Sequence, residues 1–124
     1  MRRTTPVAVA VVLFCAVVIH LRAATITVTN TNDSGPGSLR QALAAANNGD
    51  TIHFAVTGTI SLTSGELLVD KNVAISGPGA TMLAVDGNAT NRVFHIGPGK
   101  TVSILGLMVT NGLTASENGG GILN

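Results

Sequence analysis

Carboxylates are the side chains that could do chemistry together in this chain, because grouped aspartates and glutamates can act as general acid and base. Six are present, at Asp33, Asp50, Glu66, Asp70, Asp86 and Glu117. They are scattered along the sequence, and most of the aspartates stand beside Gly or Asn. Aspartate in such a setting favours turns, in which its side chain bonds to nearby backbone. We therefore expect these aspartates to form turns rather than an acid–base site.

The histidines and the cations give no stronger indication of a site. His53 and His95 each adjoin a Phe within an apolar run, and no third ligand stands at a metal-binding spacing. Arg40 falls on the surface of a predicted helix, where a solvated or locally paired role is expected. Arg92 and Lys100 flank predicted strands as corner charges. The sequence thus predicts no catalytic, cofactor-binding or metal-ligating residue, and no cofactor.

The first 23 residues have the layout of a secretory signal peptide. Arg2 and Arg3 precede an unbroken run of thirteen apolar residues from Val7 to Ile19, and small residues end the segment at Ala23 and Ala24. The run is shorter than the roughly 20 residues of an ordinary membrane-spanning helix. We expect cleavage after Ala23 and a secreted or cell-surface protein. An uncleaved membrane anchor is the alternative, and any membrane contact is expected only through this leader or a C-terminal anchor.

Removing the leader changes the charge and the cysteine content. Four basic and six acidic residues remain, which gives the mature chain a net charge of −2 instead of +1. No basic patch survives, so nucleic-acid binding has little support. Cys15 lies in the leader, so the mature chain contains no cysteine and cannot be a disulfide-stapled secreted domain.

Residues 24–50 are expected to hold one strand and one helix. Apolar residues alternate with threonines between Ala24 and Asn30, which predicts a strand with one buried face. A helix is predicted from Ser38 to about Asn47, with Ser38 and the residue three positions on as a capping box and Gly49 ending it. Its apolar stripe is Leu39, Ala42, Leu43 and Ala46, which leaves Arg40 and Asn47 facing water.

The sequence pattern changes in residues 51–124. Short apolar runs of three or four residues recur between Gly, Asn, Pro and Asp, and they lie at 51–54, 59–62, 67–69, 73–75, 82–85, 93–96, 102–105 and 107–109. Some segments echo one another: 71–75 resembles 100–104, 77–79 resembles 97–99, and 28–30 resembles 109–111. The mature chain has only two aromatic residues, Phe54 and Phe94, which disfavours a β-sandwich. We predict an all-β fold, a right-handed parallel β-helix whose exposed first coil is covered by the helix.

The residues also resemble a known group of proteins. Gly37-Ser38-Leu39-Arg40-Gln41-Ala42-Leu43, with Ala46-Asn47 and Gly49-Asp50-Thr51-Ile52-His53-Phe54, resembles the N-terminal module of bacterial cell-surface proteins called CSLREA-type. Gly37 and Gln41 replace the first and fifth residues of the motif that names the group. Segments from Ile75 to Gly112 resemble the pectin-lyase-like β-helix that follows this module. The terminal 119–124 resembles the Gly-Gly-Ala-Ile repeats of polymorphic outer-membrane proteins.

The resemblance implies a function class but no activity. Pectin-degrading β-helix enzymes use clustered carboxylates with Ca²⁺ and a base, or grouped aspartates, and no such cluster stands in this sequence. We expect a non-catalytic N-terminal part of a secreted or cell-surface β-helix protein, used for adhesion, binding or structure. The alternative is the start of a polysaccharide lyase or glycoside hydrolase whose active site lies downstream. The expected partner is an extracellular polysaccharide or a cell-surface component, and the β-helix is expected to be truncated after Asn124.

Overall fold

A computed structural model describes residues 23–114 and 119–124. The predicted signal peptide, apart from Ala23, lies outside these residues, as does Glu117. The described chain contains ten short strands and one helix. These are β1 (Thr25–Val28), α1 (Leu39–Ala45), β2 (Thr51–Phe54), β3 (Gly58–Ser61), β4 (Leu67–Val69), β5 (Val73–Ser76), β6 (Leu83–Asp86), β7 (Phe94–Ile96), β8 (Val102–Leu105), β9 (Met108–Thr110) and β10 (Ile122–Leu123).

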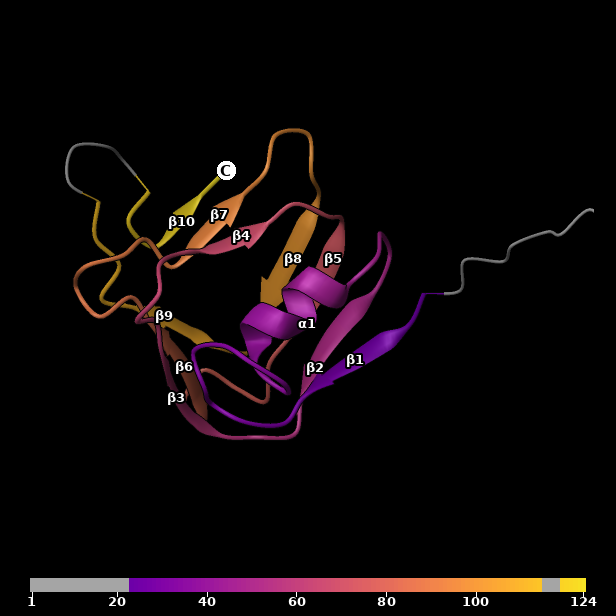
Figure 1. Cartoon of the computed structure of the whole chain (residues 1–124), viewed down its shortest axis with the longest axis horizontal. Coiled ribbons are helices and arrows are strands. Elements are labelled where there is room, and N and C mark those ends of the chain that lie inside the picture. The colour runs from indigo at the N-terminus through magenta and orange to yellow at the C-terminus, as the bar shows by residue number, and fades with distance from the viewer. Residues whose placement is uncertain (1–22, 115–118) are drawn as a thin grey trace, which may run out of the picture.

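The strands form a parallel β-solenoid of about four turns (Figure 1). Three sheets run along it, in the orders β1-β2-β5-β8, β3-β6-β9 and β4-β7-β10, and all the pairings in the described part of the chain are parallel. Each full coil therefore supplies one strand to each sheet. The first coil supplies only β1, and the chain then continues into α1. The expectation of a parallel β-helix with one short helix is confirmed, and parallel pairing of this kind rules out an antiparallel sandwich.

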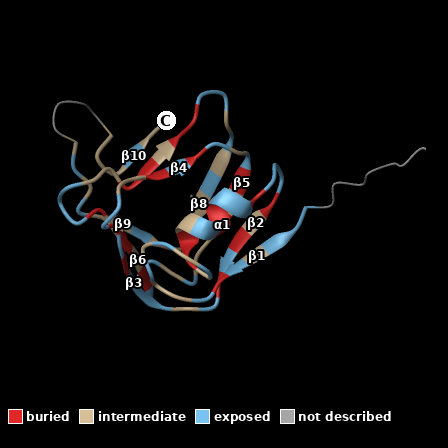
Figure 2. Cartoon of the chain, viewed as in Figure 1, coloured by how far each residue is buried: buried red, intermediate tan, exposed pale blue. Residues whose placement is uncertain are grey.

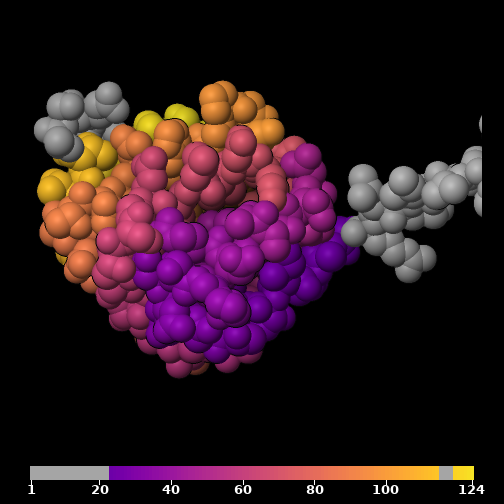
Figure 3. Space-filling view, viewed as in Figure 1, coloured from indigo at the N-terminus to yellow at the C-terminus, as the bar shows by residue number. Residues whose placement is uncertain are grey.

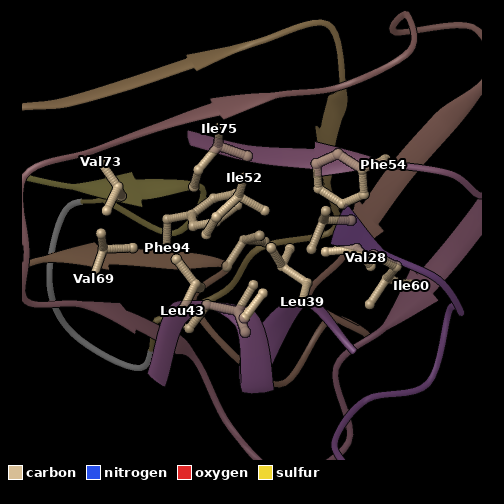
Figure 4. Packing of buried hydrophobic residues seen from close by; sticks show 14 of the residues in the cluster. Val28, Leu39, Leu43, Ile52, Phe54, Ile60, Val69, Val73, Ile75 and Phe94 are labelled. Atoms are coloured by element: carbon tan, nitrogen blue, oxygen red, sulfur yellow. The ribbon is translucent and has the colours of Figure 1, made fainter. Parts of the chain in front are cut away.

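The strands are short because each coil must turn a corner after three or four residues. Inward residues alternate with outward ones, so Ile52 and Phe54 of β2 are buried while His53 between them is exposed. The inward side chains of successive coils stack on one another: Ile26, Ile52, Ile75 and Ile104 occupy one continuous row of partners. Figure 2 shows buried residues alternating with less buried ones along the strands, and Figure 4 shows side chains of the buried residues pointing toward one another.

Helix α1 covers the N-terminal end of this stack. Ser38 caps it by accepting a hydrogen bond from the Gln41 N–H through its side chain, as the sequence predicts. Leu39, Ala42, Leu43 and Ala46, the predicted apolar stripe, are all buried. Leu39 and Leu43 point into the core beside Val28 and Ile52 (Figure 4). The helix thus shields the interior end of the first coils from water.

The helix ends two residues before the predicted position. The helix stops at Ala45, with Ala46 as its extended C-cap, rather than continuing to Asn47. The N–H of Asn47 donates to the Asp50 carboxylate, and the N–H of Gly49 donates to the carbonyl of Asn72. These bonds hold the segment in the first corner of the solenoid, so Gly49 belongs to that corner and not to the helix end.

Of the three pairs of similar segments found in the sequence, one lies at equivalent positions on neighbouring coils. Val73 pairs with Val102 and Ile75 with Ile104, so the 71–75 and 100–104 segments stack 29 residues apart. The corner before them is joined by side chains: Asn48 Oδ1 accepts from the Asn72 N–H at 2.9 Å, and Asn72 Oδ1 accepts from the Thr101 N–H at 2.7 Å. The other two echoes do not stack. Residues 28–30 and 109–111 belong to different sheets, and Gly77 lies against Gly106 rather than against the 97–99 segment.

The contact between Gly77 and Gly106 gives the first prediction. A Cβ at position 77 would run into the backbone carbonyl of Gly106, which cannot move without breaking the stack. We expect Gly77→Ala to destabilise the fold by about 2–3 kcal/mol, measured by urea unfolding. Gly121→Ala is the matched control, because a Cβ there would meet only the Val109 side chain at an ordinary 3.6 Å. Equal stability of the two variants would contradict the close stacking at this corner.

Candidate functional site

Polar side chains form two clusters, one at the helix-covered end of the solenoid and one that extends along it. The first is centred on Arg40 of α1, and we call it the Arg40 cluster: Asp33, Arg40, Thr63 and Ser64. The second, on the outer side of the sheet that contains β4 and β7, is the Glu66 cluster: Glu66, Arg92 and His95. A shallow groove lies between α1 and β4, beside both clusters.

Arg40 was expected to be either solvated or locally paired, and its guanidinium is paired. Its Nη2 donates to Asp33 Oδ1 at 3.0 Å and to the Gly65 carbonyl at 2.8 Å, and its Nη1 donates to the Glu66 carbonyl at 2.7 Å. Its Nε donates to the Asp33 carbonyl at 3.1 Å. The guanidinium therefore joins the 29–38 loop to the segment that leads into β4. Arg40 faces water only in part: 26% of its side chain is exposed, and the guanidinium folds over the end of the second coil.

Asp33 was expected to form a local turn, and it instead makes contacts about thirty residues away. Its carboxylate accepts from the Thr63 N–H at 3.0 Å and from the Ser64 hydroxyl, in addition to the ion pair with Arg40. Burial raises the pKa of Asp33, but the hydrogen bonds from Ser64, Thr63 and Arg40 outweigh this and lower the pKa to about 2. The carboxylate thus holds the loop before the helix onto the second coil.

The Glu66 cluster joins three successive coils. Glu66 Oε2 accepts from Arg92 Nη1 at 3.0 Å, and Glu66 Oε1 lies 3.0 Å from His95 Nδ1. Arg92 Nε donates to the Gly119 carbonyl at 3.1 Å. Burial raises the pKa of Glu66, but the hydrogen bonds and charges of His95 and Arg92 leave it below its ordinary value. A carboxylate that orients a histidine is the arrangement from which general bases are built.

The groove has an apolar floor and a rim of both charges. Its volume is about 350 Å³, and Figure 3 shows it as a hollow between the helix and the β4 strand. Lys71 at one end donates to the Ala44 carbonyl at 2.8 Å, where it also complements the negative end of the helix. The residues that line it are Arg40, Leu43, Ala44, Glu66, Leu67, Leu68, Asp70 and Lys71. Of the Glu66–His95 pair, only Glu66 lines this groove, so the histidine lies outside it.

The remaining residues singled out in the sequence have structural surroundings. Asp86 accepts from the Asn88 N–H at 2.7 Å, which is the local turn expected of it. His53 is exposed on the outer face of β2. Within residues 23–114 and 119–124, no three His, Cys, Asp or Glu side chains lie close enough to hold a metal ion. In that same part of the chain, no helix has the length and apolar character needed to cross a membrane.

The Glu66 cluster was missed in the sequence, although a signal for it was present. Arg92 and His95 follow Glu66 by 26 and 29 residues. The echo of 71–75 in 100–104 has the same 29-residue spacing, and in a solenoid that spacing places residues on neighbouring coils. Applying this period to Glu66 would have placed His95 beside it.

Comparison of the chain with protein-family models, with curated proteins and with solved structures gave no match.

The lowered pKa of Asp33 predicts a pH-dependent stability. A depressed carboxyl pKa adds stability that is present above the ordinary pKa of about 4 and is lost as pH falls toward 2. After allowance for partial exposure, we expect wild type to lose on the order of 1–2 kcal/mol from this group over that interval. Asp33→Asn should be less stable by a similar amount at pH 7, measured by urea unfolding. The wild-type and variant stabilities should converge near pH 2, and a constant gap at every pH would contradict this role.

Proposed function

We propose that the chain is exported and forms a non-catalytic β-helix module of a secreted or cell-surface protein, which binds an extracellular polysaccharide. We take the solenoid to be right-handed, as crossover connections between parallel strands almost always are. The export part of the proposal rests on the leader pattern of residues 1–23. The binding part rests on one observation, the outward face of the β1-β2-β5-β8 sheet, which we call the hydroxyl face.

The hydroxyl face is built from outward side chains held in register by four strands. Two rows of partners cross it: the first runs through Thr25, Thr51, Ala74 and Ser103, and the second through Thr27, His53, Ser76 and Leu105. Five of these eight side chains carry a hydroxyl group, and none is Asp, Glu, Lys or Arg. Neighbouring strands in a sheet lie about 4.8 Å apart, so the rows place hydroxyl groups close together, with Ala74, His53 and Leu105 between them.

A face that bears hydroxyl groups and no charged side chain suits a polysaccharide of low charge. Its side chains can donate and accept hydrogen bonds along an extended polymer that carries many hydroxyls of its own. An acidic polymer would instead favour a row of Lys or Arg, which this face lacks. The mature chain has no Trp or Tyr, so recognition through hydrogen bonding fits it better than recognition by ring stacking.

The contacts of the charged residues support a non-catalytic module. Asp33, Asp50 and Asp86 each accept hydrogen bonds from backbone N–H groups, and Arg40 and Lys71 each donate to backbone carbonyls. These side chains stabilise the solenoid and its cap. One observation favours a second candidate function, a polysaccharide-cleaving enzyme: the Glu66–His95 pair has the geometry of an oriented base.

The hydroxyl face gives a binding prediction. Thr27→Glu places a negative charge on β1, at one end of the second row of the face. A charge that loses its water on binding and finds no partner opposes binding to a neutral polymer. We expect retention on insoluble neutral polysaccharides, measured by pull-down and affinity electrophoresis, to fall at least about fivefold, or about 1 kcal/mol. Thr59→Glu is the matched control, an exposed strand threonine on the β3-β6-β9 sheet. An equal loss of retention in both variants, or unchanged retention in both, would rule out this face as the binding surface.

A turnover assay separates the two candidate functions. On pectin-like and neutral polysaccharides we expect no new reducing or unsaturated ends, measured over long incubations with the purified chain. Turnover that His95→Ala and Glu66→Gln both abolish would establish the enzyme instead. His53→Ala is the control for the loss of a histidine elsewhere on the surface.

A further inference from the structure

The carboxylate of Asp50 is buried at the place where the chain enters the fold. Asp50 is only 3% exposed, and Ser38 is the other buried polar residue among those the structure describes. One carboxylate oxygen accepts from the Ala24 N–H at 2.9 Å, and the other accepts from the Asn47 N–H at 2.8 Å. Both of these hydrogen-bond donors are uncharged amides, although burying a charge is costly unless an opposite charge compensates it.

Ala24 is held against this carboxylate by the ladder itself. The Thr51 N–H donates to the Ala24 carbonyl at 2.9 Å, just before Thr25 pairs with Thr51 and β1 begins. The nitrogen of Ala24 is therefore fixed beside Asp50 by the register of the first two strands. Ala23 and Ala24 are both exposed, so the peptide bond between them lies at the surface. This bond is also the cleavage point that the leader pattern predicts.

We propose that removal of the leader between Ala23 and Ala24 places the new α-ammonium group of Ala24 on the buried carboxylate of Asp50, so that processing completes the first coil with an ion pair. A leader peptidase supplies the reaction, in which water cleaves the peptide bond. The hydroxyl of the water joins the Ala23 carbonyl carbon, its hydrogen joins the Ala24 nitrogen, and the resulting amine takes up a proton. The inference rests on the export part of the proposed function.

The exchange of an amide for an ammonium strengthens a contact that already has the right geometry. A charge-assisted hydrogen bond is roughly twice as strong as a neutral one. Lys71, in the turn between β4 and β5, is the other charged group that acts on Asp50, and its Nζ donates to the Ala44 carbonyl. The α-ammonium would thus be the cation in direct contact with Asp50. The same carboxylate would hold β1 in register and position the mature N-terminus.

The test uses the full reading frame expressed in an exporting host, with alanine labelled for NMR. N-terminal sequencing of the exported protein should give Ala24 as its first residue. The pKa of the Ala24 α-amine, followed through its Cβ resonance, should lie well above about 8, which is the ordinary upper value. It should return to the ordinary range in Asp50→Asn, whereas Asp70→Asn, which changes an exposed carboxylate, should leave it raised. Because Asp50→Asn can impair folding, the wild-type titration is repeated in urea, where the raised pKa should also return to normal.

The outcomes separate this inference from the proposed function. An exported chain that begins at another residue, an α-amine pKa at or below about 8, or a raised pKa that survives in Asp50→Asn would overturn the ion pair. Each of these would leave export itself intact. A chain that stays in the cell with its leader attached would overturn both.

Discussion

The fold depends on one constraint, which is that each coil must lie in register on the coil before it. Parallel ladders satisfy the backbone groups of a strand only when its neighbour has the same direction and spacing. Once β1 and β2 are aligned, the inward positions of every later strand are fixed, and Ile26, Ile52, Ile75 and Ile104 must fall in one row. The hydrophobic core follows from the ladder, because a shift by one residue would turn every inward side chain to the outside.

The corners pose the harder problem, because backbone groups there leave the ladder and still need partners. Asn48 and Asn72 solve it with side-chain oxygens that accept from the N–H of the next coil. Gly77 and Gly106 solve it by close approach of backbone to backbone, which no larger residue permits. At the capped end, a loop and a helix replace two strands. There the side chains of Asp33 and Arg40 form hydrogen bonds with the backbone groups that have left the ladder. Most polar side chains with a long-range bond are thus parts of the stacking, and few remain for chemistry.

The elements of this fold were predictable from the sequence to the extent that local signals determine them. The Ser38 cap, the apolar stripe of α1 and most short strands follow from spacing and residue type, and the structure confirms them. The end of the helix was not predictable, because the bonds that stop it come from Asp50 and from Asn72 on the next coil. Apart from the Asp33–Arg40 pair, whose members are 7 residues apart, the partners of Asp33, Arg40 and the Glu66 cluster lie 25 to 31 residues away, about one coil, and local patterns could not predict them. In a solenoid, local sequence patterns predict the strands. Contacts between side chains on neighbouring coils can be predicted only from the length of the coil.

The two ends of the stack differ in a way that follows from the same constraint. At the first end, α1 buries the inward residues, and Ile52 is fully buried. At the other end, Ile122 occupies the inward row of Phe94 and yet is 44% exposed, while Phe94 one coil earlier is fully buried. The difference is positional rather than chemical, because Phe94 has a coil on each side and Ile122 has one. The cap, the Asp33–Arg40 ion pair and the buried carboxylate of Asp50 lie at the first end, where the register of the first two strands is set, whereas the Glu66–Arg92 ion pair joins the second and third coils.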